Sequence, residues 1–433
     1  MSPDRPIANH LPAAMVLLPT VFVVEVILGG PFGIYGGIPV RLMLLAASCA
    51  VLAFGVFLRG RLVRSHLLPM LGIGGFLVFN GVWVAIVPVL TGINMHWALR
   101  EPHAFIVLGL VVLALALLNR PQLAVAVPRL QRLVVVTSLV LAAFQVGLWF
   151  LGTILGNLRW VVPFALALVF PGGSDQLYVG QMPDGFFRVF WISTLWCVLS
   201  FFWVPVVFPS GRLKWLCQGL LLLDAFVAYS RGIWVGMLVG QMVVLSAVLT
   251  PRRAGRVLVR FAVAATLAVG VLVGILAATG SLDRGLARLS STASRDDESI
   301  GQRVEQAPHL LRLWYDHPVL GSGYGAYAPS HIRAQEAPYS YEHMPYALLA
   351  KLGLLGVLGS GIFIAGWAFT AWEARRRFPA AAASFLGGGT ALLIAEMTNP
   401  MVLNFVSMTI LACLLFQWAQ LVSPSDSAGP WVA

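Results

Sequence analysis

The sequence is poor in charged residues. Only 10% of its 433 residues are charged, whereas 59% are hydrophobic, and the mean hydropathy is +0.86. A water-soluble surface requires roughly 25–35% charged residues, so this composition excludes a soluble fold. The chain is therefore predicted to be an all-α polytopic membrane protein, with a lipid bilayer as its solvent.

Cysteine is scarce as well. The four cysteines all lie inside apolar runs: Cys49, Cys197, Cys217 and Cys413. They show no Cys-x-x-Cys spacing, and no histidines cluster with them, which argues against a disulfide framework and against a metal site. The acidic run Asp296–Glu298 lies in a polar stretch and is expected to be solvated. We expect small buried cysteine side chains, and we expect neither a metal nor a cofactor.

Lysine is nearly absent, because Lys214 and Lys351 are the only two. The net charge of +11 therefore comes almost wholly from arginine. A basic chain can bind nucleic acid or anionic lipid, and the positions of its arginines distinguish these partners. Here the arginines gather between long apolar runs. Membrane lipids are therefore the expected partners, and nucleic acid is not.

Long apolar runs recur along the whole chain. A helix needs about 20 apolar residues to cross a hydrocarbon core roughly 30 Å thick. About twelve runs are long enough, and they lie near 12–30, 39–58, 67–92, 103–119, 133–154, 189–208, 213–230, 232–250, 258–279, 345–371, 379–397 and 401–422. A further stretch near 158–171 is too short to cross. We predict that it is a re-entrant or interfacial segment.

The basic residues between these runs predict the topology. Short cytoplasmic loops collect arginine and lysine, and every basic cluster follows an even-numbered run if the 158–171 segment does not cross. The clusters are Arg59, Arg61 and Arg64; Arg120, Arg129 and Arg132; Arg212 and Lys214; Arg252, Arg253 and Arg256; and Arg375, Arg376 and Arg377. This regularity predicts that both termini are cytoplasmic and that the first run is a retained anchor.

The topology divides the chain into four parts. Residues 1–279 are predicted to hold transmembrane helices 1–9, residues 280–344 to form a long outer loop, residues 345–422 to hold helices 10–12, and residues 423–433 to form a cytoplasmic tail. Between Ser299 and Tyr315 the long loop mixes apolar and charged residues, a pattern typical of short amphipathic helices at a membrane surface. Loops longer than about 15 residues are usually functional.

Several arginines lie on the outer side, against the bias that sets the topology. They are Arg188, Arg231, Arg284, Arg288, Arg295, Arg303, Arg312 and Arg333. The planar guanidinium fork suits phosphate oxygens, so an anionic ligand would explain them. Arg231 is the clearest candidate, because it lies in a very short turn between two apolar runs. The alternative is that these arginines are interfacial anchors with snorkelling side chains.

His343 stands directly before the tenth apolar run. Pro345 suits the first turn of a helix, so the imidazole is expected at a helix N-terminus on the outer side. A positive helix end disfavours the imidazolium ion, which leaves a neutral ring able to accept a proton near pH 7. His343 is therefore a candidate general base. The alternative is an ordinary hydrogen-bonded interfacial histidine.

Ionisable residues also occur inside the apolar runs, where such groups usually face a partner or a cavity. Asp224 lies two helical turns before Arg231 and is a candidate to position that arginine. Lys351 follows His343 on a similar helical face. In a transporter, a chain of such groups would instead serve as a proton pathway.

Three stretches then combine into one pattern. His343 opens a predicted helix ten residues before a Gly-x-x-Gly pair at 353–356, Arg303 leads the predicted helix that precedes His-Pro-Val-Leu-Gly-Ser-Gly-Tyr-Gly at 317–325, and residues 230–232 read Ser-Arg-Gly. Over roughly 188–360 this ordered set resembles the O-antigen ligase and O-antigen polymerase superfamily of bacterial envelope polysaccharide enzymes. Met344 stands where that family usually has Asn or Ser, so the sequence leaves the orientation of His343 open.

The resemblance implies a membrane glycosyltransferase of the bacterial inner membrane with its active site facing the periplasm. It implies a glycan donor linked to undecaprenyl diphosphate and, for the O-antigen ligase that we favour, lipid A-core as the acceptor. Arg231 and Arg303, with Arg188 as a weaker third, would bind the diphosphate, and His343 would act as the general base of a metal-independent, inverting transfer. The candidate supporting residues are Arg312, Asp224 and Lys351.

Two other functions stay open. An O-antigen polymerase would use the same donor chemistry with a second lipid-linked glycan as acceptor. Polymerases of this superfamily tend to carry two long arginine-bearing outer loops, whereas the earlier outer segment here, about 155–188, is shorter and poorer in arginine. A lipid-linked-glycan flippase or transporter is less consistent with the sequence, because transporters place polar groups on broken helices at the midplane and here they gather at one face.

Overall fold

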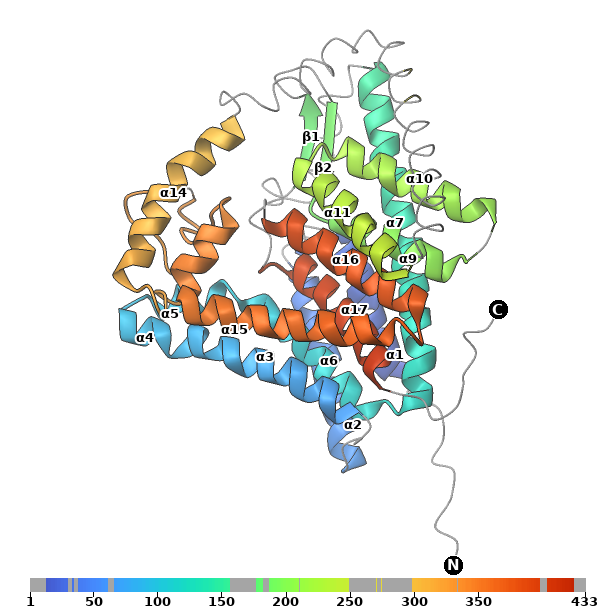
Figure 1. Cartoon of the computed structure of the whole chain (residues 1–433), viewed down its shortest axis with the longest axis horizontal. Coiled ribbons are helices and arrows are strands. Elements are labelled where there is room, and N and C mark those ends of the chain that lie inside the picture. Colours follow the sequence, from blue (N-terminus) through green and yellow to red (C-terminus); the bar gives the residue numbers. More distant parts are fainter. Residues whose placement is uncertain are drawn as a thin grey trace, which may run out of the picture.

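The computed structural model describes residues 13–29, 33–34, 38–60, 66–155, 177–181, 187–209, 211–248, 270, 274, 298–332, 334–397 and 403–423. Helices account for most of this structure (Figure 1). They are α1 (Ala13–Gly29), α2 (Val40–Arg59), α3 (Leu67–Ala85), α4 (Val87–Thr91), α5 (Met95–Arg100), η2 (His103–Phe105), α6 (Ile106–Leu117), α7 (Arg120–Leu155), α9 (Thr194–Val207), α10 (Arg212–Val227), α11 (Arg231–Val248), α14 (Glu298–Asp316), α15 (Met344–Ala374), α16 (Pro379–Met397) and α17 (Phe405–Val422). The strands β1 (Leu177–Gln181) and β2 (Phe187–Trp191) form one antiparallel hairpin.

Seven helical segments of the described chain are long and apolar enough to cross a membrane: Val40–Arg59, Leu67–Thr91, Met95–Leu117, Arg120–Thr153, Met344–Ala374, Pro379–Met397 and Phe405–Val422. Three shorter helices are also apolar, namely Met15–Gly29, Thr194–Val207 and Arg231–Ala247. The fold is therefore that of a mostly helical, multi-pass membrane protein. The count of twelve stays a prediction, because most of the run 258–279 and the segment near 158–171 lie outside the described residues.

The structure differs from the sequence expectations at the hairpin and in the outer loop. The predicted run 189–208 begins as strand β2, and its helix starts only at Thr194. The aromatic and β-branched residues of β2 favour a strand. Phe187 and Val189 are buried on one face of the strand, and Arg188 lies on the other face. The predicted short amphipathic helices between Ser299 and Tyr315 are one continuous 19-residue helix, α14, despite Pro308 inside it.

Helix α15 is broken near its beginning. Gly353 has φ 60° and ψ −174°, a conformation that is essentially restricted to glycine, so the helical hydrogen-bond ladder is interrupted there. The loop at 318–325 supplies the missing partners. The backbone N–H groups of Ser322 and Gly323 donate to the carbonyls of Ala350 (2.9 Å) and Lys351 (2.8 Å). On the other side of the break, the N–H groups of Leu354 and Leu355 donate to the carbonyls at 318 and 319, each at 3.0 Å.

The two backbones approach too closely for side chains. A Cβ on Gly353 would lie 2.3 Å from the backbone nitrogen of Gly321, and a Cβ on Gly321 would lie 2.3 Å from the carbonyl oxygen of Lys351. Both glycines have positive φ angles. The Gly-x-Gly loop and the Gly-x-x-Gly pair noted in the sequence are therefore two halves of one interlocked unit.

The same loop also holds α3 and α4. Trp83 of α3 donates its indole N–H to the carbonyl of Leu320 (2.7 Å), and its own carbonyl accepts the N–H of Tyr324 (3.0 Å). The Tyr324 hydroxyl donates to the side-chain oxygen of Asn80 (3.0 Å). Because α15 also runs alongside α3 (Figure 1), the loop fixes α15 to that layer. The segment that carries His343 is thereby anchored from its C-terminal side.

A second tight contact positions Arg231. Helix α11 packs along α16, and a Cβ on Gly236 or Gly240 would lie 2.3 Å from the carbonyl of Ala391 or 2.5 Å from that of Gly387. Small residues allow membrane helices to approach this closely. At the start of α11, the Trp234 indole donates to the carbonyl of Ala225 (2.8 Å). The turn that presents Arg231 is therefore held by both α10 and α16.

Candidate active site

His343 is the N-cap residue of α15, as the sequence predicts. Its ring packs against Tyr346, with 4.2 Å between the ring centroids. The Nδ1 atom is buried and has no hydrogen-bond partner among the described residues. Helix α14 lies beside this segment in Figure 1, and it brings Arg303 to the imidazole.

Gln306 connects α14 to the backbone at His343. Its side-chain oxygen accepts the N–H of Glu342 (3.0 Å) and the N–H of His343 (3.3 Å). Gln306 is only 1% exposed and follows Arg303 by three residues, so both face the same segment from one side of α14. The contact holds the backbone at His343 from another helix. The sequence did not single out Gln306, since one glutamine in an amphipathic stretch looks like any other surface residue.

Burial and charge act on the imidazole in the same direction. The pKa of His343 is lowered from its ordinary value first by burial and then by the positive charge of Arg303. The Arg303 Nε lies 3.7 Å from a carboxylate oxygen of Glu342, and the Glu342 side chain is 14% exposed. The imidazole is therefore neutral at pH 7, with a cation held next to it.

Arg188 contacts the turn that precedes Arg231. Arg188 lies on β2 opposite Gly180, and its Nε donates to the carbonyl of Ala228 at 2.9 Å. Its guanidinium carbon lies 4.7 Å from the ring centroid of Phe190, a cation–π contact. Ala228 begins the turn that leads to Arg231, in which Tyr229 has a positive φ of 55°. The structure thus joins Arg188 to the turn of Arg231 and Arg303 to His343.

Lys351 has a structural partner that the sequence analysis missed. Its ammonium lies 2.5 Å from a carboxylate oxygen of Glu101, and the two side chains are 4% and 7% exposed. The ammonium also donates to the carbonyl of Tyr339 (2.7 Å), and the second oxygen of Glu101 accepts the N–H of Gly325 (2.6 Å). This pair lies against the loop that fills the break in α15. A lysine buried in a membrane protein requires an acidic partner on the same side of the membrane. A search of the sequence for such an acid could have identified Glu101.

The other predicted residues take separate places. Asp224 is fully buried in α10, with its carboxylate beside Cys197 of α9, so its role toward Arg231 stays a prediction. Arg312 is exposed on α14. Outside the described residues lie Arg284, Arg288, Arg295 and Arg333. Within the part of the chain that the structure describes, no three His, Cys, Asp or Glu side chains gather so that they could hold a metal ion.

Comparison with known protein families agrees with the sequence motifs. Residues 217–359 match the family model described as O-Antigen ligase, which confirms the resemblance to the O-antigen ligase superfamily. Members of this family are membrane glycosyltransferase-like enzymes of the ligase or polymerase type. The matched region contains Arg231, Arg303 and His343, whereas Arg188 and Glu101 lie outside it. No curated protein matches the chain.

The buried ion pair makes a prediction about stability. Lys351→Met leaves the Glu101 carboxylate buried without its cation, so the free energy of unfolding in detergent should fall by about 3–5 kcal/mol. Glu101→Gln should cost a similar amount. The double variant should recover most of the loss, because neither charge is then left alone. Lys214→Met, which changes the other lysine, should have little effect. Strictly additive losses in the double variant would contradict a direct coupling.

Proposed function

We propose that the chain is an O-antigen ligase that transfers a glycan from undecaprenyl diphosphate to a sugar hydroxyl of lipid A-core at the periplasmic face of the inner membrane. The observation that carries this proposal is the placement of His343 at the start of a membrane-spanning helix, beside Arg303 of α14. Both residues lie inside the region that matches the O-antigen ligase family. The proposed donor, acceptor and residue roles rest on this pairing and on the chemistry of a diphosphate-linked donor.

In this reaction the acceptor oxygen forms a bond to the anomeric carbon as the bond from that carbon to the diphosphate oxygen breaks. The electron pair of the broken bond leaves with the diphosphate, and the hydroxyl proton passes to the imidazole of His343. Because Nδ1 is buried, Nε2 is the nitrogen that would take the proton. Attack from the face opposite the leaving group inverts the configuration.

The arginines would neutralise the departing diphosphate. Arg303 already lies beside the base, and Arg231 stands at the end of a helix held by α10 and α16. Arg188 would contribute through its position on the Arg231 turn. Charge-assisted contacts from guanidinium groups to phosphate oxygens are strong and directional, so this arrangement supports a transfer without a metal ion.

Substitution of the base and of the arginines tests the reaction. His343→Ala, Arg231→Ala and Arg303→Ala should each lower transfer by roughly 10²–10³-fold in purified protein supplied with undecaprenyl-diphosphate-linked glycan and lipid A-core, because each removes a group that acts in the transition state. Arg231→Lys should also be impaired, since an ammonium cannot make the bidentate contact.

Arg132→Ala is the control for these variants, because Arg132 is an exposed arginine on α7 that has no proposed part in the reaction. It should keep wild-type transfer. A wild-type rate in His343→Ala would overturn the assignment of the base. In cells, deletion of the gene should leave free lipid A-core with polymer on the lipid carrier, whereas core capped with single repeats would indicate a polymerase.

The contacts of Gln306 predict a positioning role. Gln306→Met keeps a similar volume but removes the oxygen that accepts the N–H groups of Glu342 and His343. Transfer should fall about 10²-fold, mainly through kcat with little change in KM for the donor, because a small displacement of a base is costly. Gln306→Glu retains an acceptor oxygen and should keep more activity. Equal loss in both variants would contradict a role through this hydrogen bond.

The lowered pKa of His343 predicts the pH dependence. Transfer needs the neutral ring, so activity should be retained until the pH falls below about 6.5, the ordinary histidine pKa, and should decline as the ring becomes protonated. Arg303→Gln removes the cation that lowers this pKa, so the acidic limb of its residual activity should move to higher pH. Arg132→Gln should leave the limb in place. An unchanged limb in Arg303→Gln would show that Arg303 does not act on the base.

A further inference from the structure

An apolar cavity lies among helices other than α14 and α15, which carry Arg303 and His343. It has a volume of about 890 Å³ and is lined by residues of α1, α2, α6, α7 and α17. Phe105, just before α6, contacts Tyr324 of the loop, and the lining of the cavity then follows α6 from Val107 to Leu118. The cavity is therefore separate from the candidate active site.

The cavity has the depth of one leaflet. Along α6 its lining runs from Val107 to Leu118, roughly 16 Å at 1.5 Å per residue. That length is about half of a hydrocarbon core roughly 30 Å thick. Aliphatic side chains make up most of the wall, and Phe22 and Phe416 add two aromatic rings. The space suits hydrocarbon chains that enter from a single leaflet.

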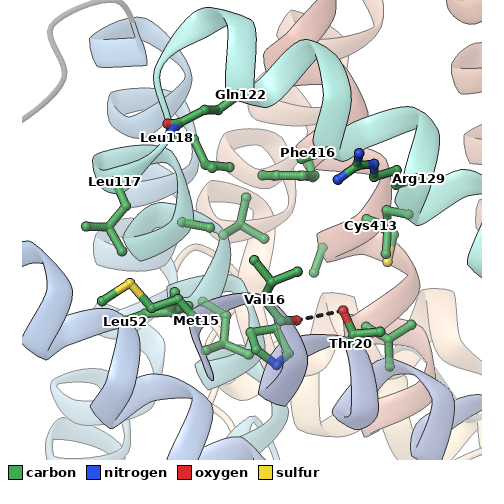
Figure 2. A pocket seen from close by; sticks show the side chains of 18 of the residues that line it. Met15, Val16, Thr20, Leu52, Leu117, Leu118, Gln122, Arg129, Cys413 and Phe416 are labelled. Carbon is green, nitrogen blue, oxygen red and sulfur yellow. Dashed lines mark hydrogen bonds between the residues drawn. The ribbon is translucent and has the colours of Figure 1, made fainter. Parts of the chain in front are cut away.

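One wall of the cavity is cationic. Figure 2 shows Arg129 extending from α7 toward Phe416, with Gln122 on the same helix. Gln122 and Asn119 cap the start of α7 reciprocally, through side-chain to backbone hydrogen bonds of 3.0 and 2.9 Å, so this wall is fixed. Nearby, Arg59 at the end of α2 donates to the carbonyl of Leu117.

Arg129 need not lie within the hydrocarbon. The 36 residues of α7 extend about 54 Å, well beyond the thickness of the core. The first turns of α7 therefore have room at the boundary where phosphate groups lie. A guanidinium in the lining of an apolar cavity complements a lipid with hydrocarbon tails and a negative head group, whereas a neutral lipid would leave its charge unmatched.

We propose that this cavity binds an anionic phospholipid from the arginine-rich side of the membrane, with acyl chains between α1, α6, α7 and α17 and its phosphate at Arg129. The site does not depend on the proposed glycan transfer. The site gives Arg129 a role in binding lipid, in addition to its place among the basic residues that predict the topology.

Native mass spectrometry of the purified full-length chain, titrated with phosphatidylglycerol or phosphatidylethanolamine, tests the site. Wild-type protein should retain phosphatidylglycerol preferentially. Arg129→Gln should lower its retention about fivefold relative to wild type, the ratio expected for one cation at a membrane surface. Arg132→Gln is the matched control, because Arg132 is exposed on the same helix and does not line the cavity, and it should retain the lipid as wild type does.

Ala114→Phe, which places a ring inside the cavity, should reduce the retention of both phospholipids. Ala126→Phe places a ring in the cavity from α7, and it replaces Ala114→Phe in the experiment if that variant fails to fold. Equal retention of the two lipids by wild-type protein, or unchanged phosphatidylglycerol binding in Arg129→Gln, would overturn the proposal. So would displacement of phosphatidylglycerol by an equimolar polyprenyl phosphate, because the cavity would then be a site for the prenyl chain.

Discussion

The fold around the candidate active site depends on one backbone interaction, the insertion of the 318–325 loop into the break of α15. A membrane helix can be interrupted only where its released N–H and C=O groups find partners inside the protein. Here the loop supplies those partners on both sides of Gly353 and at the same time binds Trp83 and Asn80 of α3. Because the loop follows α14 directly, the same interaction also sets α14 beside His343.

The ion pair between Lys351 and Glu101 belongs to this unit. Glu101 accepts the N–H of Gly325 from the loop, and Lys351 lies on the last turn before the break. A broken helix with buried charges is also a feature of transporters. In this chain the break is filled by backbone from the loop and the charges neutralise each other, so both features contribute to the support of the His343 segment. The alternative of a proton pathway through Lys351 loses its main motivation.

The sequence was sufficient for the membrane class, for most helix positions and for the position of His343 at the start of a helix, because these depend on the length of apolar runs and on a proline in the first turn. It could not predict the break at Gly353, since a glycine inside an apolar run reads as helix until a second segment competes for its backbone. Glu101 and Gln306 were missed because each gains its role from a residue distant in sequence, Lys351 and His343 respectively. The strand at Arg188 was hidden because its aromatic residues continue into the apolar helix α9.

Glycan transfer by Gly353→Ala tests the central claim most directly, with Gly361→Ala as the matched control on the same helix. A Cβ at Gly353 would collide with the loop backbone and would require a conformation that alanine rarely adopts, whereas a Cβ at Gly361 meets nothing within 4 Å. We expect Gly353→Ala to insert into the membrane and to lose transfer, and Gly361→Ala to retain it. Wild-type transfer by Gly353→Ala would contradict the account, because the interlocked loop would then not be needed to hold the base and Arg303 together.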